Sequence, residues 1–394
     1  MNIECKLKAN IWKTYAYWFF HSLIFAYVIE RLFWQQRGIS VKQVVYTEII
    51  YAGMVVILEI PSGSLADKCG RKALMILSSV FTFLEFLILI FATSFWHFAL
   101  AVSVAAIGRS FSSGTSNALV YDSLKLIGEE ASFEKVLGKI RFFDGASSSA
   151  AAICGSVIAY KYSYLSVYKL SLVSTVAAFV ISLSFHEPNI KTLDEESNLP
   201  LSYYMKEAFN FLKGEKNIRF VLYFGIILAA CTVYIDEFWQ LYFKEINIPV
   251  IYFGIFTALT QLFNSFSGLI SYKLKKHFAY KTIFSVSLVI YFTGIIGASF
   301  ISSYYGIILI VAAYWMSGIS DPLISGYLHH KTKSQFRATV ESYQSLALRF
   351  CTIIVGLIFG FFSDRYAVLI GFRTLGIIAL FYGIYYIAAM PKKI

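Results

Sequence analysis

The chain has 394 residues, of which 58% are hydrophobic and only 14% are charged. This composition excludes a soluble protein, because a water-facing surface of that size needs many more charged side chains. A formal net charge of +11 would suit a nucleic-acid-binding protein. The basic residues are scattered between apolar runs, however, so membrane topology explains them and no nucleic-acid partner is expected. The sequence therefore predicts a polytopic protein of the cell (inner or plasma) membrane.

Apolar windows of about 20 residues, the length that crosses a bilayer, recur along the whole chain. The predicted spans are 11–33, 44–65, 73–92, 98–124, 136–159, 165–185, 220–243, 251–272, 282–301, 305–328, 338–362 and 368–389. When the N-terminus is placed inside, most Lys and Arg residues fall in cytoplasmic turns or at cytoplasmic helix ends. Both termini are therefore expected on the cytoplasmic side.

The longest polar interval, 186–218, divides the chain almost in half. It predicts a cytoplasmic linker between two six-helix bundles, formed by residues 1–185 and 219–394. Apolar residues at helical spacing within this interval indicate a helix that lies on the membrane surface.

The two halves show weak internal repetition. Glu30 of the first span aligns with Glu237 of the seventh span, where Asp236 lies beside it. Asn117 of the fourth span aligns with Asp321 of the tenth span. Such repetition is typical of transporters that are built from two related bundles.

A polar stretch at 61–75 reads PSGSLADKCGRKALM and separates the second and third spans. Because both neighbours are apolar spans, it is predicted to be a tight turn at the cytoplasmic surface. The positions that fit the pattern G-x-L-A-D-x-x-G-R-K are Gly63, Leu65, Ala66, Asp67, Gly70, Arg71 and Lys72. This pattern resembles the signature of the major facilitator superfamily between its second and third helices. The resemblance implies an all-α fold, with twelve transmembrane helices in two bundles related by pseudo-two-fold symmetry, and transport by alternating access.

The resemblance also implies a gating role for the turn. Gly63 would let two helices approach closely, and Gly70 would adopt a positive backbone angle. Asp67 and Arg71, together with Asp122 at the cytoplasmic end of the fourth span, resemble the family's charge relay, which closes the cytoplasmic side. The alternative is that these charges only set the topology.

Acidic residues inside the predicted spans are candidates for proton coupling. A carboxylate in a cavity that opens to either side can bind a proton on one side and release it on the other. We select Glu30, Asp236 and Asp321 on this basis; a fixed salt bridge is the alternative for each. Glu85 of the third span has no role that the sequence explains.

Polar and aromatic residues on the spans that would surround a central cavity are candidates for substrate contact. They are His21, Tyr27, Arg109, Asn117, Tyr234, Gln261, Asn264, Trp315 and Arg349. Arg109 and Arg349 lie near the middle of the predicted fourth and eleventh spans. A cavity role is favoured for both, and structural ion pairs are the alternative.

The favoured function is a proton-coupled exporter of amphiphilic drugs or metabolites, and the alternative is a proton-coupled uptake symporter for a small organic anion or nutrient. Acids in a cavity suit cationic or proton-linked cargo, whereas the arginines would suit an anion. An enzyme is disfavoured, because the histidines lack metal-ligand spacing and no phosphate loop or activated nucleophile is present. No metal or cofactor is expected. The protein is expected to be a monomer. A transport-inactive sensor of the same fold is a further alternative.

Overall fold

The computed structural model describes residues 3–113, 115–188, 215–301, 303–331 and 337–389, apart from the side chains of 3, 59–64, 66–68, 265, 268–269, 329–330 and 337–342. The chain forms two compact units, Met1–Leu193 with Pro249–Ala258 and Asp194–Ile248 with Leu259–Ile394. The linker helix predicted from the sequence falls within 189–214 and lies outside the described residues. The domain boundaries at 185 and 219 stay predictions.

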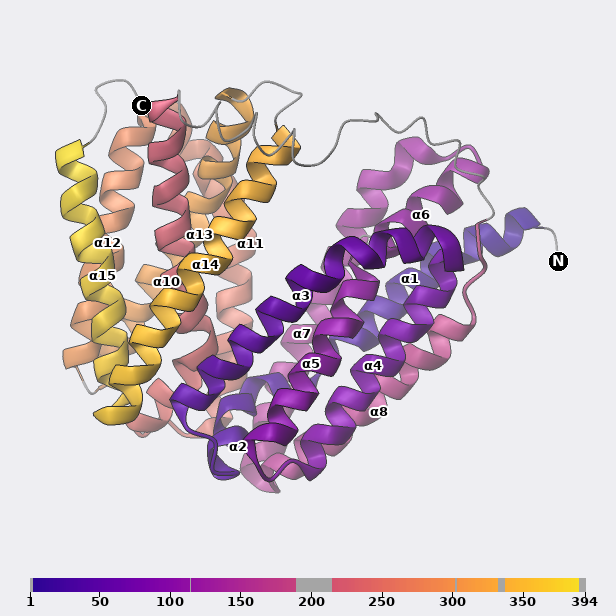
Figure 1. The fold of residues 1–394 in the computed structure, drawn as a ribbon, viewed down its shortest axis with the longest axis horizontal. Helices are drawn as coiled ribbons and strands as arrows, with labels where there is room; N and C mark the ends of the chain where they lie inside the picture. The colour runs from indigo at the N-terminus through magenta and orange to yellow at the C-terminus, as the bar shows by residue number, and fades with distance from the viewer. Residues whose placement is uncertain (1–2, 114, 189–214, 302, 332–336, 390–394) are drawn as a thin grey trace. The chain divides into compact units, whose positions relative to one another are not determined.

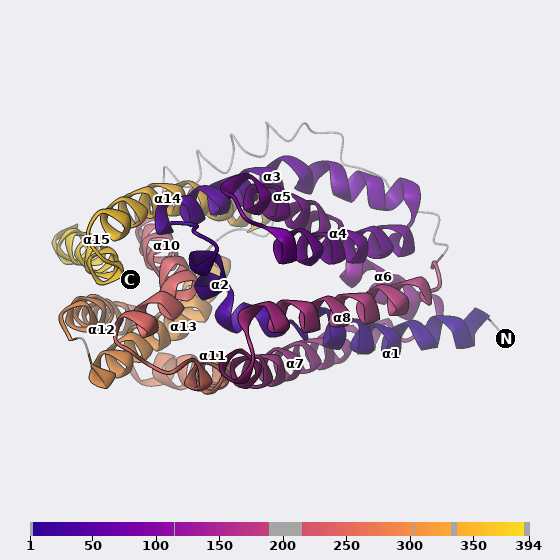
Figure 2. The same cartoon turned by 90° about the horizontal axis from the view of Figure 1, so that it is seen from below.

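The first unit is built from helices throughout its described residues (Figure 1). They are α1 (Ile3–Ser22), η1 (Phe25–Ile29), α2 (Glu30–Gln36), α3 (Val41–Cys69), α4 (Arg71–Phe91), α5 (Phe95–Ser112), α6 (Thr115–Leu126), η2 (Glu130–Ser132), α7 (Phe133–Lys161) and α8 (Tyr164–Leu183). The helix α1 packs against both α7 and α8 (Figure 2).

The later part of the chain is also helical. Its elements are α10 (Lys216–Glu245), η3 (Val250–Tyr252), α11 (Phe253–His277), α12 (Tyr280–Phe300), α13 (Tyr304–Lys331), α14 (Arg337–Arg365) and α15 (Val368–Ala389). The helix α10 packs against α13, α14 and α15, and 67% of its apolar window is buried. This helix is therefore the core of the second unit.

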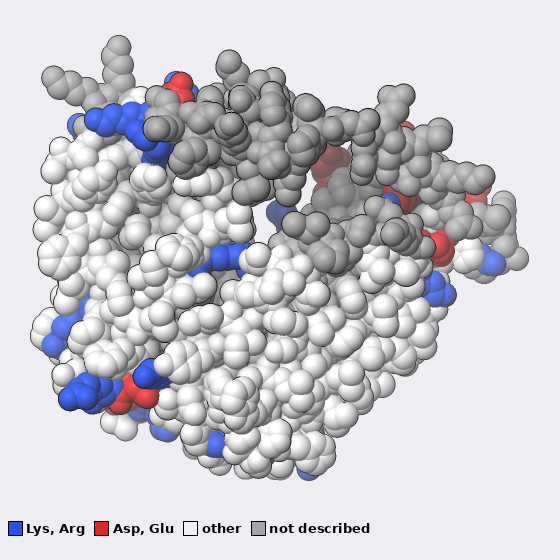
Figure 3. Space-filling view, in the orientation of Figure 1, with Lys and Arg blue, Asp and Glu red and all other residues white. Residues whose placement is uncertain are grey.

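Nine helices in the described part of the chain are long and apolar enough to cross a membrane. They are α3, α4, α7, α8, α10, α12, α13, α14 and α15. The other predicted spans correspond to α1 with α2, to α5 with α6, and to α11. Most of the described surface visible in Figure 3 carries no charged side chain, as a lipid-facing surface requires.

The first span is not the single helix that its apolar window predicted. The helix α1 ends at Ser22, and the chain continues through η1 into α2. A break in apolar surroundings frees peptide groups that must find other partners. The hydroxyl oxygen of Ser171 on α8 accepts a hydrogen bond from the N–H of Ala26 at 3.0 Å, and Ala26 is fully buried. A side chain of a neighbouring helix thus stabilises the break.

The helix α7 packs directly against this break. A Cβ atom added to Gly155 would lie 2.3 Å from the carbonyl oxygen of Phe25. That separation is well inside van der Waals contact, so the two backbones approach this closely only because Gly155 has no side chain.

The turn predicted at 61–75 is much shorter than expected. The helix α3 continues to Cys69 and α4 begins at Arg71, so Gly70 is the only residue between them. Gly70 has a φ of 91°, the positive angle expected for it. A helix satisfies its own peptide groups in water as well as in lipid, so α3 can extend beyond its apolar window.

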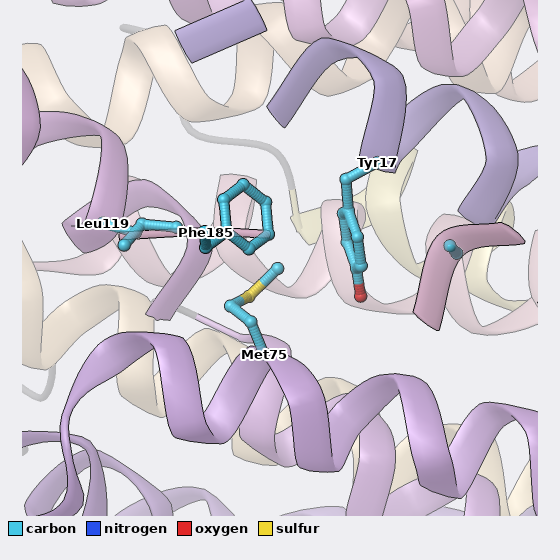
Figure 4. Packing of buried hydrophobic residues seen from close by; sticks show 5 residues of the cluster. Tyr17, Met75, Leu119 and Phe185 are labelled. Atoms are coloured by element: carbon cyan, nitrogen blue, oxygen red, sulfur yellow. The ribbon is translucent and has the colours of Figure 1, made fainter. Parts of the chain in front are cut away.

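A buried cluster joins four segments of the first unit. Tyr17 of α1, Met75 of α4, Leu119 of α6 and Phe185, which follows α8, meet there together with Ala178 (Figure 4). Each of these side chains is almost completely buried. The cluster therefore fixes α1 and α6 relative to each other.

The contact between Gly155 and Phe25 yields a stability prediction. The variant Gly155→Ala should unfold at a lower temperature in detergent, because overpacking of this kind costs about 1–3 kcal/mol. The matched control is Gly145→Ala on the same helix, where an added Cβ meets no heavy atom within 4 Å. Equal unfolding temperatures for the two variants would contradict the close approach.

Candidate functional site

A pocket in the first unit lies where α5 gives way to α6. It has a volume of about 320 Å³, which is enough for a small organic molecule. The residues that line it come from α1, α5, α6, α7 and the α5–α6 junction. They are Trp18, Arg109, Ser112, Ser113, Ser116, Asn117, Leu137, Ile140, Arg141 and Asp144.

The pocket is polar partly because the fourth span consists of two helices. The helix α5 ends at Ser112 and α6 begins at Thr115. The last carbonyls of one helix and the first N–H groups of the next have no partners within their own helix. The N-terminus of α6 also carries a partial positive charge. The sequence placed Arg109 near the middle of one span, but the structure places it in the last turn of α5.

Two arginines give the pocket its charge. Arg109 comes from α5 and Arg141 from α7, and both side chains are exposed to the pocket space. Neither forms a hydrogen bond or ion pair with any residue that the structure describes. Asp144 lies one turn beyond Arg141 on α7, and its carboxylate accepts a hydrogen bond from the Ser22 hydroxyl. The pocket therefore has a positive charge to offer a ligand.

Trp18 forms one wall of the pocket in a fixed orientation. Its indole N–H donates to the Ser116 hydroxyl at 2.9 Å. The His21 ring lies 5.1 Å from the Trp18 ring, centroid to centroid. His21, which was predicted to contact substrate, thus packs behind Trp18 and does not line the pocket.

Glu30 and Tyr27 lie elsewhere in the first unit, and Glu30 lies beside the buried Arg31. One Arg31 nitrogen, Nη2, is 2.7 Å from a Glu48 oxygen, and Nη1 is 4.0 Å from a Glu30 oxygen. Tyr27 is half exposed, and its ring lies 6.0 Å from the Phe86 ring, centroid to centroid. Glu30, a predicted proton carrier, therefore has a guanidinium beside it.

In the second unit, Asp236 belongs to a short hydrogen-bonded chain. The Tyr314 hydroxyl donates to an Asp236 carboxylate oxygen at 3.3 Å, and the Asn264 amide donates to the Tyr314 oxygen at 3.2 Å. This chain joins α10, α13 and α11, and it unites two of the predicted site residues.

Tyr234 was predicted to line the substrate cavity, and the structure places it inside the helix packing instead. It is only 1% exposed, and its hydroxyl donates to the Thr352 carbonyl at 2.8 Å. Its neighbour on the α14 side is Gly356. Sequence spacing identified the helix correctly but not the face that Tyr234 occupies.

The other predicted residues of the second unit do not form one site. Trp315 packs against Phe263, with tilted rings whose centroids are 5.2 Å apart. Gln261 is half-buried on α11, and Asp321 is exposed on α13. Arg349 is half-buried on α14 and forms no hydrogen bond or ion pair with a described residue. Within the described chain, no cluster of His, Cys, Asp and Glu could hold a metal ion.

The end of α4 next to Gly70 carries an ion pair and a cap. Arg71 Nε donates to Asp122 Oδ2 at 2.5 Å, so these two predicted gating residues are in contact. The Glu187 carboxylate accepts from the backbone N–H groups of Arg71 and Lys72 at 2.8 and 2.7 Å. The side chains of Gly63 and Asp67 lie outside the described part of the structure.

Asn10 of α1 fixes the segment that carries Glu187. Its amide nitrogen donates to the His186 carbonyl at 2.8 Å, and its amide oxygen accepts from the His186 N–H at 2.9 Å. The same amide nitrogen donates to the Ser123 hydroxyl at 3.0 Å. Sequence reasoning missed both Asn10 and Glu187, because nothing in their spacing links them to residues 70–72.

Sequence reasoning found only part of the pocket. Arg109 and Asn117 were predicted as substrate contacts and line the pocket together. Arg141 and Asp144 were not selected. The available signals were the position of Asp144 inside a predicted span and the three-residue spacing, which places both residues on one face of a helix.

The sequence profile described as "Major Facilitator Superfamily" matches residues 15–340, which is most of the chain. The chain belongs to the major facilitator superfamily. The predicted family and the predicted fold are thus confirmed, and the protein is an all-α, multi-pass membrane transporter with twelve transmembrane helices in two bundles. Membership indicates a transporter of small molecules rather than an enzyme.

Several solved transporters share this fold. The nucleoside transporter NupG is 15% identical, with 100% of both chains covered and a TM-score of 0.77. A bacterial homolog of the human lysosomal transporter Spinster is 13% identical over 98% of this chain and 97% of its own, with a TM-score of 0.73. A D-xylose-proton symporter is 10% identical over 97% and 98%, with a TM-score of 0.71. No curated protein matches the chain by sequence.

The ion pair beside α4 yields a prediction that separates gating from binding. The variant Asp122→Asn leaves Arg71 without its carboxylate, so the balance between conformations should shift by about 5–30-fold. We expect a matching loss of transport rate, with substrate affinity changed by no more than a few fold. Transport in proteoliposomes and binding in detergent measure the two quantities separately.

The matched control is Glu129→Gln. Glu129 pairs with Lys8 at 3.4 Å, and both side chains are about half exposed, so its loss should cost little. A drop in affinity for Asp122→Asn as large as that of a pocket variant would rule out a purely conformational role.

Proposed function

We propose that this transporter is a proton-coupled symporter that takes up a small organic anion by alternating access. The observation that carries the proposal is the pocket with Arg109 and Arg141, which have no carboxylate partner among the described residues. A guanidinium binds carboxylate and phosphate groups through paired, charge-assisted hydrogen bonds. With Asp144 ionised, the side chains that line the pocket keep a net charge of +1.

The pocket favours the second of the two functions expected from the sequence. An exporter of amphiphilic cations would need an acidic or largely apolar cavity, whereas this one is basic and rich in hydroxyl groups. Its volume of about 320 Å³ is at the lower limit for small-molecule sites, which suits a compact solute. The Trp18 wall would pack against a planar or aromatic portion of that solute.

Uptake of a compact polar solute is also compatible with the solved relatives. Two of them are named as a nucleoside transporter and a D-xylose-proton symporter. Since identity to both is low, their names support the class of cargo and the coupling ion only as part of this proposal.

Three acids remain proposed as proton sites, namely Glu30, Asp236 and Asp321. The contacts of Asp236 support it best, because the Tyr314 hydroxyl and the Asn264 amide form a hydrogen-bonded chain that ends on its carboxylate. Protons would reach such a group through a cavity that opens to each side in turn.

The region around Gly70 is proposed as the conformational latch. Arg71 and Asp122 form its ion pair, and Gly63 and Asp67 complete the signature that the family uses there. A latch of this kind shifts the population of states without touching the substrate.

Flux measurements in sealed proteoliposomes with an imposed pH gradient test the proposed function. Benzoate, lactate, phosphate and glutamate serve as the anions, and tetraphenylphosphonium and ethidium serve as the lipophilic cations. Movement of protons and one of the anions in the same direction would support the symporter. Proton movement opposite to a lipophilic cation, without any response to anions, would support the exporter instead.

The two arginines should contribute separately to substrate binding. Each of Arg109→Gln and Arg141→Gln should raise the KM for the anion about 10-fold or more, because a hydrogen bond to a charged group contributes about 1.5–3 kcal/mol. The control is Lys161→Gln, which changes an exposed cation at the end of the same α7 helix. An unchanged KM in both arginine variants would exclude the pocket as the anion site.

A further inference from the structure

Asp144 is the only carboxylate among the described residues that line the pocket. It shares the pocket with Arg109 and Arg141, and any anion held by these arginines would lie close to its carboxylate. The structure thus places one titratable acid and two fixed positive charges around a single ligand space. This arrangement determines whether a bound anion strengthens or weakens the binding of a proton.

In the empty pocket the Asp144 carboxylate shares its space with the guanidinium groups of Arg109 and Arg141. A bound anion adds a negative charge within the same space, and this opposes the ionised form. Anion binding therefore increases the affinity of Asp144 for a proton. By reciprocity, a proton on Asp144 must strengthen anion binding by the same factor.

We propose that Asp144 binds the proton that accompanies the anion, so that the pocket itself couples the two. The proton comes from the solvent and is held on the carboxylate while the anion occupies the arginines. The inference rests on the proposed function, since it requires an anionic substrate.

The hydrogen bond from Ser22 supports this assignment. Ser22 is the last residue of α1, and its hydroxyl donates to the Asp144 carboxylate. A hydroxyl can also accept a hydrogen bond, so the same contact can be kept when Asp144 carries a proton. Protonation therefore requires no rearrangement of α1 against α7.

Other titratable groups near Asp144 have to be distinguished from it. On its own helix, α7, Arg141 faces the pocket and Lys139 lies over the Tyr15 ring at 5.9 Å. Tyr15 of α1 stacks on Phe143 with ring centroids 5.5 Å apart, and His21 of α1 lies behind Trp18.

The remaining elements around α7 add one charged group to the pocket. The helix α5 contributes Arg109, and α6 contributes only the neutral Ser116 and Asn117. The segments η1, η2, η3 and α8 contribute none of the described residues that line it. His21 is the one rival, because a proton on it would also favour an anion.

The test is the pH dependence of anion binding to the purified full-length protein. Benzoate, lactate and glutamate, whose carboxylates stay ionised throughout this range, are titrated by isothermal calorimetry at pH 5.5 and 7.5. For the wild-type protein we expect Kd to rise by about 5–100-fold between these pH values, because coupling to one proton changes Kd by at most about 10-fold per pH unit. For Asp144→Asn we expect a Kd that changes by less than about 2-fold over the same range and lies near the wild-type value at pH 5.5.

Three further variants isolate the role of Asp144. Asp144→Glu restores a titratable acid, so it should restore the pH dependence. His21→Gln and Glu129→Gln, which changes a half-exposed acid outside the pocket, should both keep the wild-type pH dependence of binding. In proteoliposomes, Asp144→Asn should still exchange internal for external anion but should no longer accumulate it in response to a pH gradient.

The possible outcomes separate this inference from the proposed function. Anion binding that stays pH-dependent in Asp144→Asn but loses its pH dependence in His21→Gln would overturn the inference and leave the function intact. Absence of saturable binding for every anion in the wild-type protein at both pH values would overturn the proposed function, and the inference with it.

Discussion

A bilayer offers no hydrogen-bond partner to a peptide group, and this constraint governs the whole structure. Almost every described span meets it with an uninterrupted helix. The exceptions are the first and fourth spans, where α1 gives way to η1 and α5 to α6. At the first break Ser171 satisfies a freed N–H group. At the second break the helix ends contribute to the polar lining of a pocket. The site thus lies where the backbone departs from regular helix.

The fold was accessible from the sequence because lipid burial leaves a strong signal in composition. The apolar windows located the spans, and the G-x-L-A-D-x-x-G-R-K pattern at 63–72 identified the family. The same windows did not reveal the breaks. The residues around Ile24 are mostly apolar, and the small, polar stretch around Ser113 (RSFSSGTSN) lies inside a longer apolar window. Nor could they show that α3 continues to Cys69, because a polar helix and a polar turn have similar compositions.

The site was only partly accessible, for a geometric reason. Arg109 drew attention because a charge within an apolar window is costly. Arg141 and Asp144 also lie inside a predicted span, but near its start, where charged residues are common, so neither was selected. Tyr234 shows the converse error: it lies on the expected helix, yet its hydroxyl is committed to the Thr352 carbonyl. The packing of several distant segments decides which face of a helix lines a cavity. No local sequence pattern can therefore predict that face.

The short helix α6 connects the pocket with the region of the proposed latch. Ser116 and Asn117 in its first turn line the pocket, while Asp122 pairs with Arg71 near its other end. Asn117 and Asp122 are separated by about 7.5 Å along the helix axis, at 1.5 Å per residue. A helix of this length moves as a rigid body, so a displacement of its first turn by a bound anion also displaces Asp122. The Arg71–Asp122 contact is 2.5 Å long, so a movement of about 2 Å, at the upper end of helix shifts in known transitions, would take the two groups beyond hydrogen-bonding distance.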